Sequence, residues 1–153
     1  MRTRLARSLF GLVLFALASL PLHADQVMMA RSPQAFPEAM LQLQELIGEQ
    51  GYTVSRVQRV DIGLTQSGYQ TDKYRVVFFG RAEEIKRLIA DHPELVPYLP
   101  LKVAIFAEAE NTMLVASNPA LWERFFPDPE LAPVFARWAG DLQAIFDAMR
   151  AGE

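Results

Sequence analysis

The residues that could perform catalysis are few. The chain of 153 residues contains two histidines, His23 and His92, and no cysteine. Without cysteine there is no disulfide, no thiol nucleophile, no thiolate metal site and no haem attachment through CxxCH. A Ser-His-Asp triad needs a histidine that an acid holds against a nucleophile. His92 precedes Pro93 at the predicted end of a helix, where it would equally stabilise the helix C-terminus. We therefore predict no catalytic residue, and keep a small hydrolase-type enzyme using carboxylates or His92 as the alternative.

Residues that could bind a metal ion or a cofactor are equally scarce. Met28, Met29 and His92 would offer soft ligands to copper. However, methionine more often fills a core, and adjacent residues of a strand point to opposite faces. Acids such as Glu83 and Glu84 stand at predicted helix starts, where they stabilise the helix dipole. No glycine-rich phosphate-binding motif occurs. We predict neither a metal nor a cofactor.

Basic residues inside predicted strands are the strongest candidates for a binding site. In the stretch YLPLKVAIF, residues 98–106, Lys102 interrupts the most strand-like run of the chain. Leu101, Val103 and Ile105 are the stronger apolar set and should face the helices, so Lys102 and Phe106 share the opposite face. If the basic residues of the other strands lie there too, that face suits an acidic amphiphile or an anionic partner segment. The predicted ligand-binding residues are Lys102, Arg75, Arg59 and Phe106.

These cations could equally have one of two structural roles. Cations on an open sheet face can block aggregation and maintain the strand register. They can also line a seam between two copies of the chain. The partners that we expect are therefore a second copy of the chain, an anionic small molecule or a partner protein.

An aromatic group near the C-terminus could contact another protein. Trp122, Phe125 and Phe126 follow one another within five residues. If they are exposed, the domain would be an accessory subunit that docks through them. Packing of the last helix onto the domain explains the same residues, and we favour that interpretation.

The N-terminal segment has the features of a secretory signal peptide. Arg2, Arg4 and Arg7 precede an apolar run from Leu9 to Leu20, which is shorter than the ~20 residues of a membrane-spanning helix. We predict cleavage after Ala24 and a periplasmic protein, with an uncleaved anchor as the alternative. Residues 25–153 would then be a single domain with 12 basic and 18 acidic residues, a net charge of −6. This charge argues against nucleic-acid binding and leaves membrane contact to the export step.

The elements that must position these residues alternate between strands and helices. Phe36, Met40, Leu43 and Ile47 recur at helical spacing, and a second long stripe runs from Leu131 to Met149. The expected strands are 26–30, 52–62, 74–79, 101–107 and 112–117, and the expected helices start at Ser32, Glu83, Asn118 and Pro129. Residues 63–73 read as a polar, exposed connection, which is an alternative location for the binding surface. Residues 74–79 read as a strand covered on both faces or nearly so. The order β-α-β-β-α-β-β-α-α predicts an α+β fold, an antiparallel sheet with helices packed on one face.

Several of these segments together resemble a known family. LPLKVAIFAE (99–108), TMLVASNPAL (112–121), the strand ending in FFG and the helix ending near DHPELVPY are similar to the domain-of-unknown-function 302 (DUF 302) family over roughly residues 26–150. Two positions depart from its pattern: Arg81-Ala82 stand where Asn-Pro is common, and Leu101 where a cysteine occurs in some members. The resemblance implies an α+β layered fold like that of the TATA-binding-protein class and pairing into homodimers. It implies no activity and no catalytic residues.

Overall fold

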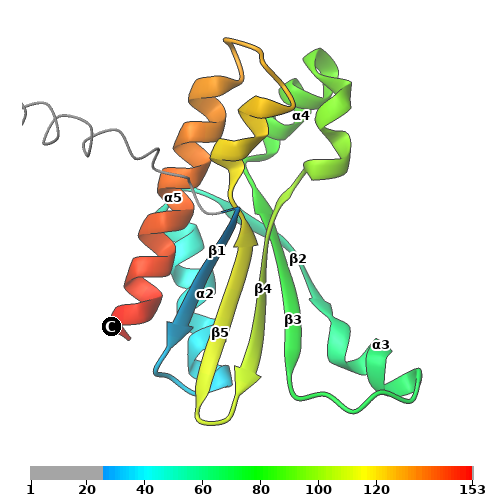
Figure 1. Ribbon diagram of the computed structural model, residues 1–153, viewed down its shortest axis with the longest axis vertical. Helices are drawn as coiled ribbons and strands as arrows, with labels where there is room; N and C mark the ends of the chain where they lie inside the picture. The colour runs from blue at the N-terminus through cyan, green and yellow to red at the C-terminus, as the bar shows by residue number, and fades with distance from the viewer. Residues whose placement is uncertain (1–25, 153) are drawn as a thin grey trace, which may run out of the picture.

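Five strands form one antiparallel sheet in the computed structural model, which describes residues 26–152. The predicted signal peptide and its cleavage site lie outside these residues. The order across the sheet is β1-β5-β4-β3-β2, so β4 is the central strand and β1 and β2 are the edges (Figure 1). The strands are β1 (Val27–Ser32), β2 (Thr53–Arg59), β3 (Tyr74–Gly80), β4 (Leu101–Glu108) and β5 (Asn111–Ser117).

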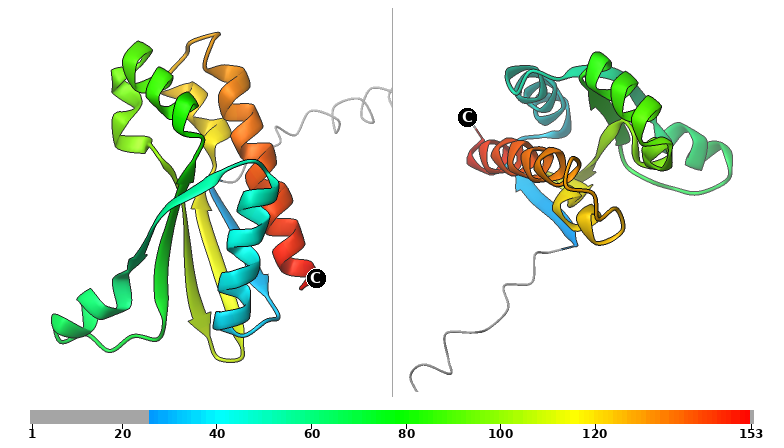
Figure 2. Two further views of the ribbon diagram at one scale, coloured as in Figure 1. Left: turned by 180° about the vertical axis from the view of Figure 1, so that it is seen from behind. Right: turned by 90° about the horizontal axis from the view of Figure 1, so that it is seen from above.

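The two long helices cover one face of this sheet. Helices α2 (Phe36–Glu49) and α5 (Ala132–Ala151) lie side by side on that face (Figure 2). The shorter helices are α3 (Val60–Gln66), α4 (Ala82–Asp91) and the 3-10 helices η1 (Pro93–Tyr98) and η2 (Pro119–Arg124). The predicted α+β class, with an antiparallel sheet and helices on one face, is confirmed. No helix within residues 26–152 has both the length and the apolar composition needed to cross a membrane.

The core lies between the sheet and the long helices. On β4, Leu101, Val103 and Ile105 are buried while Lys102 is exposed, as strand alternation predicted. The apolar stripe of α5 belongs to the same core through large buried side chains, among them Phe135, Trp138, Leu142 and Ile145. The alternation of β4 and the helical stripe of α5 each place the largest apolar residues on one side. The sheet and the helices bury those two sides against each other.

Several element boundaries differ from the prediction. The strand expected to run to Ile62 ends at Arg59, and the chain turns directly into α3. The register of β2 against β3 shifts between Val54 and Arg56. Strand β1 continues through Ser32, so that α2 begins at Phe36 instead of next to Ser32, and α5 begins at Ala132 instead of Pro129. In the β4–β5 hairpin Ala109 has a positive φ of 53°.

Strand β3 was expected to be covered on both faces or nearly so, and its two faces differ in burial. Val77 and Phe79 are fully buried under the helices, whereas Tyr74, Val76 and Phe78, on the other face, are only half-buried. Its composition suits a strand that is covered on both sides, yet the fold covers only one.

Candidate functional site

The face of the sheet that points away from α2 and α5 is mainly apolar along the central strands, and we call it the open face. Strand pairing arranges the side chains of this face in rows that run across the sheet. One row contains Val76, Ala104, Val115 and Met29, and the next row contains Tyr74, Phe106 and Met113. None of these side chains is fully buried. An antiparallel sheet with one solvated face usually alternates apolar inward and polar outward residues, and the central strands of this sheet do not.

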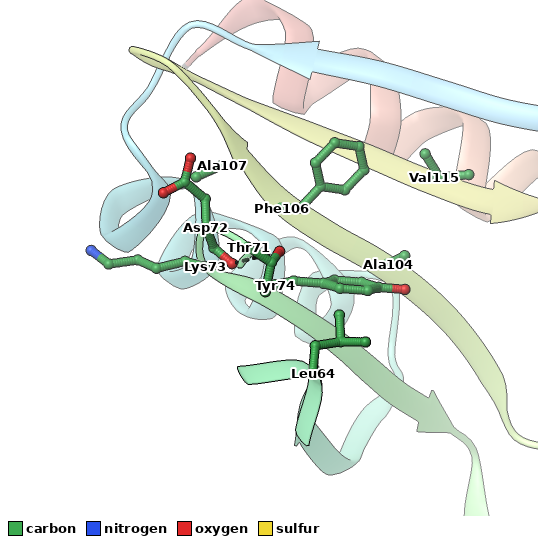
Figure 3. A pocket seen from close by; sticks show the side chains of 9 residues that line it. All are labelled: Leu64, Thr71, Asp72, Lys73, Tyr74, Ala104, Phe106, Ala107 and Val115. Carbon is green, nitrogen blue, oxygen red and sulfur yellow. Dashed lines mark hydrogen bonds between the residues drawn. The ribbon is translucent and has the colours of Figure 1, made fainter. Parts of the chain in front are cut away.

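A groove of about 600 Å³ lies on the open face. Its floor is formed by Tyr74, Ala104, Phe106 and Val115, and Leu64 from α3 forms a side (Figure 3). The rings of Tyr74 and Phe106 meet edge to face with centroids 6.2 Å apart. This volume lies within the ~300–1,000 Å³ of typical small-molecule sites, which are also mainly apolar. We call this cavity the open-face groove.

The wall that α3 provides is attached to the sheet by an ion pair. Arg75 of β3 donates a hydrogen bond to the Asp61 carboxylate, and both side chains are largely buried. This hydrogen bond lowers the pKa of Asp61 from its ordinary value. No residue of α3 is fully buried, so the helix has little packing of its own and depends on this pair and on Leu64.

The four predicted ligand-binding residues separate into two pairs. Lys102 and Phe106 lie on the open face, as predicted, and Phe106 lines the groove. Arg75 pairs across the sheet with Ile105 and therefore lies on the helix-covered face, where its guanidinium stands 5.7 Å from the centre of the Phe36 ring. Arg59 is the cross-strand neighbour of Arg75 and shares that face. The suggestion that all four cluster on one surface was wrong.

Lys102 is an exposed cation beside apolar neighbours. It lies directly across from Phe78 on β3 and two residues along β4 from Ala104 of the groove floor. Within residues 26–152 no carboxylate is within ion-pair distance of its ammonium.

Sequence reasoning did not single out Leu64 or Tyr74 among the groove residues, although Leu64 lies within the 63–73 connection that it gave as an alternative binding surface. Leu64 is an apolar residue within the polar run GLTQSGYQTDK (63–73). An isolated apolar residue in a polar segment is the sequence feature that could have indicated a contact with the sheet. Tyr74 begins β3 in alternation with Val76 and Phe78. Its pairing with Phe106 depends on the strand register, which the sequence alone does not supply.

His92 is held by acids at the end of α4. Its side chain is mostly buried, and Nδ1 lies 3.6 Å from Glu94 and 3.7 Å from Asp128. Met28 is buried in the core and Met29 points to the other face, so that His92 and the two methionines do not form a common site. In the part of the chain that the structure describes, no three His, Cys, Asp or Glu side chains are placed to share a metal ion.

The C-terminal aromatic group is mostly part of the core. Trp122 packs edge-on against Phe135 and Trp138, and Phe126 packs against Tyr98 and Phe135. Phe125, by contrast, is 72% exposed. Two of the three rings therefore attach η2 to α5, as the favoured interpretation held, and a docking surface there would consist of Phe125.

Comparison with known proteins identifies the family. The model of the family described as "Domain of unknown function DUF302" matches residues 28–149. No curated protein matches the chain. Among solved structures, the uncharacterized conserved protein DUF302 from Bacillus stearothermophilus is similar, with a TM-score of 0.74 and 20% sequence identity, over 83% of this chain and all of that one. At this identity the likeness is one of fold, and its α+β architecture agrees with the sheet and helices described above. The chain belongs to the DUF302 family.

Proposed function

We propose that this domain is a non-enzymatic binding module that holds a small, mainly apolar molecule in the open-face groove. The observation that carries the proposal is the groove itself. It has ligand-sized volume, an apolar floor on the sheet and a wall from a separate element, α3. Small-molecule sites combine these features.

The composition of the open face supports an occupant. Val76, Ala104 and Val115 occupy its centre, where polar residues would suit contact with water. Covering apolar surface gains about 25 cal/mol per Å² removed from water. A ligand that covers Phe106 and Val115 would therefore bind mainly through the hydrophobic effect, with Tyr74 adding an aromatic edge.

A neutral apolar dye, N-phenylnaphthylamine, tests the proposal through its fluorescence. We expect the wild-type domain to enhance the emission of the dye, and Phe106→Ser to weaken dye binding at least tenfold, the effect of ~1.4 kcal/mol of lost apolar contact. Phe125→Ser is the matched control, because Phe125 is also exposed but lies away from the groove. Equal dye binding by wild type and Phe106→Ser would overturn the proposal, and loss of binding only in Phe125→Ser would favour the docking surface instead.

Pairing of two copies is the second candidate for this face. Val27 and Met29 on the edge strand β1 are 48% and 51% exposed and are not part of the open-face groove. Half-exposed apolar side chains at a sheet edge favour contact with another chain. Such a contact would form a homodimer and leave the groove accessible.

We also propose that the module acts in the periplasm. The support is the basic and apolar pattern of residues 1–24. N-terminal sequencing of the protein from the cell envelope tests this. We expect the mature chain to begin at Asp25, and an intact Met1 in all of the recovered protein would contradict it.

A further inference from the structure

Resting on the proposed function, we infer the ligand class of the open-face groove: a single-chain amphiphile with a carboxylate head, of the fatty-acid type. Its tail lies over Phe106 and Ala104, and its carboxylate pairs with Lys102. This ligand class follows from the side chains at the two ends of the groove.

The geometry of β4 aligns a cation with the apolar floor. Lys102, Ala104 and Phe106 alternate onto the open face of one strand. Residues two apart in a strand are separated by about 7 Å, so Lys102 stands one such step beyond the groove floor and about 14 Å from Phe106. A lysine stem lies readily along apolar surface while its ammonium stays in water. An elongated ligand would therefore meet apolar groups first and the ammonium at its end.

The charges around the groove fix the direction of the ligand. Asp72 and Lys73 line the groove at the end away from Lys102. The ammonium of Lys73 lies over the Phe36 ring, 5.9 Å from its centre, so that the Asp72 carboxylate disfavours a carboxylate at this end. Arg31, a cation on the same face of β1, is already paired with Glu108 at 2.6 Å. Lys102 has no such partner among residues 26–152. The acidic head is thus expected at Lys102, beside the ring of Phe78.

Protection of a sheet edge does not account for this lysine. Cations that prevent edge-to-edge aggregation stand on edge strands. Lys102 stands on β4, the central strand, where it pairs with Phe78 of β3. A cation on the central strand, next to the apolar floor of the groove, marks a position where a negative charge would be stabilised.

Displacement of N-phenylnaphthylamine by three ligands with the same tail tests the inference: dodecanoate, dodecanol and dodecylamine, each below its micelle-forming concentration. We expect wild type to bind dodecanoate up to about fivefold more tightly than dodecanol, the effect of one solvent-exposed ion pair. Lys102→Met should remove this preference and leave the affinity for dodecanol unchanged. Lys102→Glu should reverse it in favour of dodecylamine. Lys86→Met, which removes an exposed lysine on α4, should behave as wild type.

The outcomes separate this inference from the proposed function. If dodecanol and dodecanoate bind equally to wild type, or if Lys102→Met keeps the preference for dodecanoate, the inference is wrong while the apolar binding module stands. If none of the three ligands displaces the dye, the inference is also overturned. If the dye itself does not bind to the wild-type domain, both the inference and the proposed function are overturned. Binding of dodecanol by each variant shows that its fold and groove are intact.

Discussion

Tyr52 joins separate parts of the chain at the end of the sheet opposite the groove. Its hydroxyl donates a hydrogen bond to the Asp141 carboxylate of α5 at 2.5 Å, and the Arg81 guanidinium lies 4.7 Å from the centre of its ring. Burial, together with the hydrogen bond and negative charge of Asp141, raises the pKa of Tyr52 above its usual range. A buried phenol bonded in this way connects β2, α5 and the start of α4, so we assign it a role in stability.

Tyr52→Phe is expected to lower the free energy of unfolding by about 1 kcal/mol at neutral pH, the usual effect of one lost hydrogen bond. The folded-state pKa is raised, so the stabilisation is complete below the pKa of free tyrosine, about 10, and is lost as the pH rises above it. Urea unfolding of both proteins checks this: their difference should persist at pH 7 and shrink above pH 10. A difference that grows with alkalinity would contradict the assignment.

At the residue scale, the sequence predicted the groove only where alternation was unambiguous. On β4 the apolar residues clearly favour one face, and both Lys102 and Phe106 were assigned correctly. On β3 nearly every residue is apolar, so its two faces could not be distinguished and Arg75 was placed on the wrong one. Arg59 followed the same error, because its register is set by its pairing with β3.

At the scale of elements, Arg75 acts on the groove indirectly. It does not lie on the open face, but it holds Asp61 of α3, and α3 carries Leu64 into the groove wall. We therefore regard Asp61 and Arg75 as positioning residues. The short helix itself was not predicted, because Val60 and Ile62 fit the alternation of a strand as well as they fit a seven-residue helix without buried residues.

Asp61→Asn should loosen this wall. We expect dye affinity to fall about fivefold, equivalent to ~1 kcal/mol, and amides of α3 to exchange hydrogen faster. Thr65→Ala, on the same helix but outside the ion pair, is the control and should change neither. Unaltered amide exchange in Asp61→Asn would show that the ion pair does not hold α3.

The same pair predicts a pH dependence at acid pH. The folded-state pKa of Asp61 is lowered, so its contribution is present above the ordinary aspartate value, about 4, and is lost as the pH falls through the lower folded value. The urea-unfolding midpoints of wild type and Asp61→Asn should differ at pH 7 and converge below pH 4. A gap that stays constant down to pH 3 would contradict this.

At the scale of the whole molecule, the element order was sufficient to predict a sheet with helices on one face. It did not reveal how apolar the uncovered face is, since that depends on which residues of β3, β4 and β5 become cross-strand neighbours. The groove also combines β3, β4 and β5 with α3, which comes from a region read as a loop. A site whose residues are brought together by the register of several strands cannot be predicted from local sequence patterns.

Pairing of two copies is tested at this scale. We expect light scattering to give the mass of two chains for wild type and of one chain for Met29→Lys, because a charge at a half-exposed apolar contact opposes burial. Leu41→Lys is the control, since Leu41 is 70% exposed on α2, on the other side of the sheet. A wild-type domain with the mass of one chain would rule out the dimer and leave the groove unaffected.

The central claim is that the open-face groove is a binding site, and a nuclear magnetic resonance titration of the domain with dodecanoate tests it most directly. We predict saturable shifts that are largest for Leu64, Ala104, Phe106 and Val115, the residues that line the groove. Lys102 should shift with them because it stands next to the floor. The absence of saturable shifts, or shifts concentrated on the exposed sides of α2 and α5, would contradict the claim.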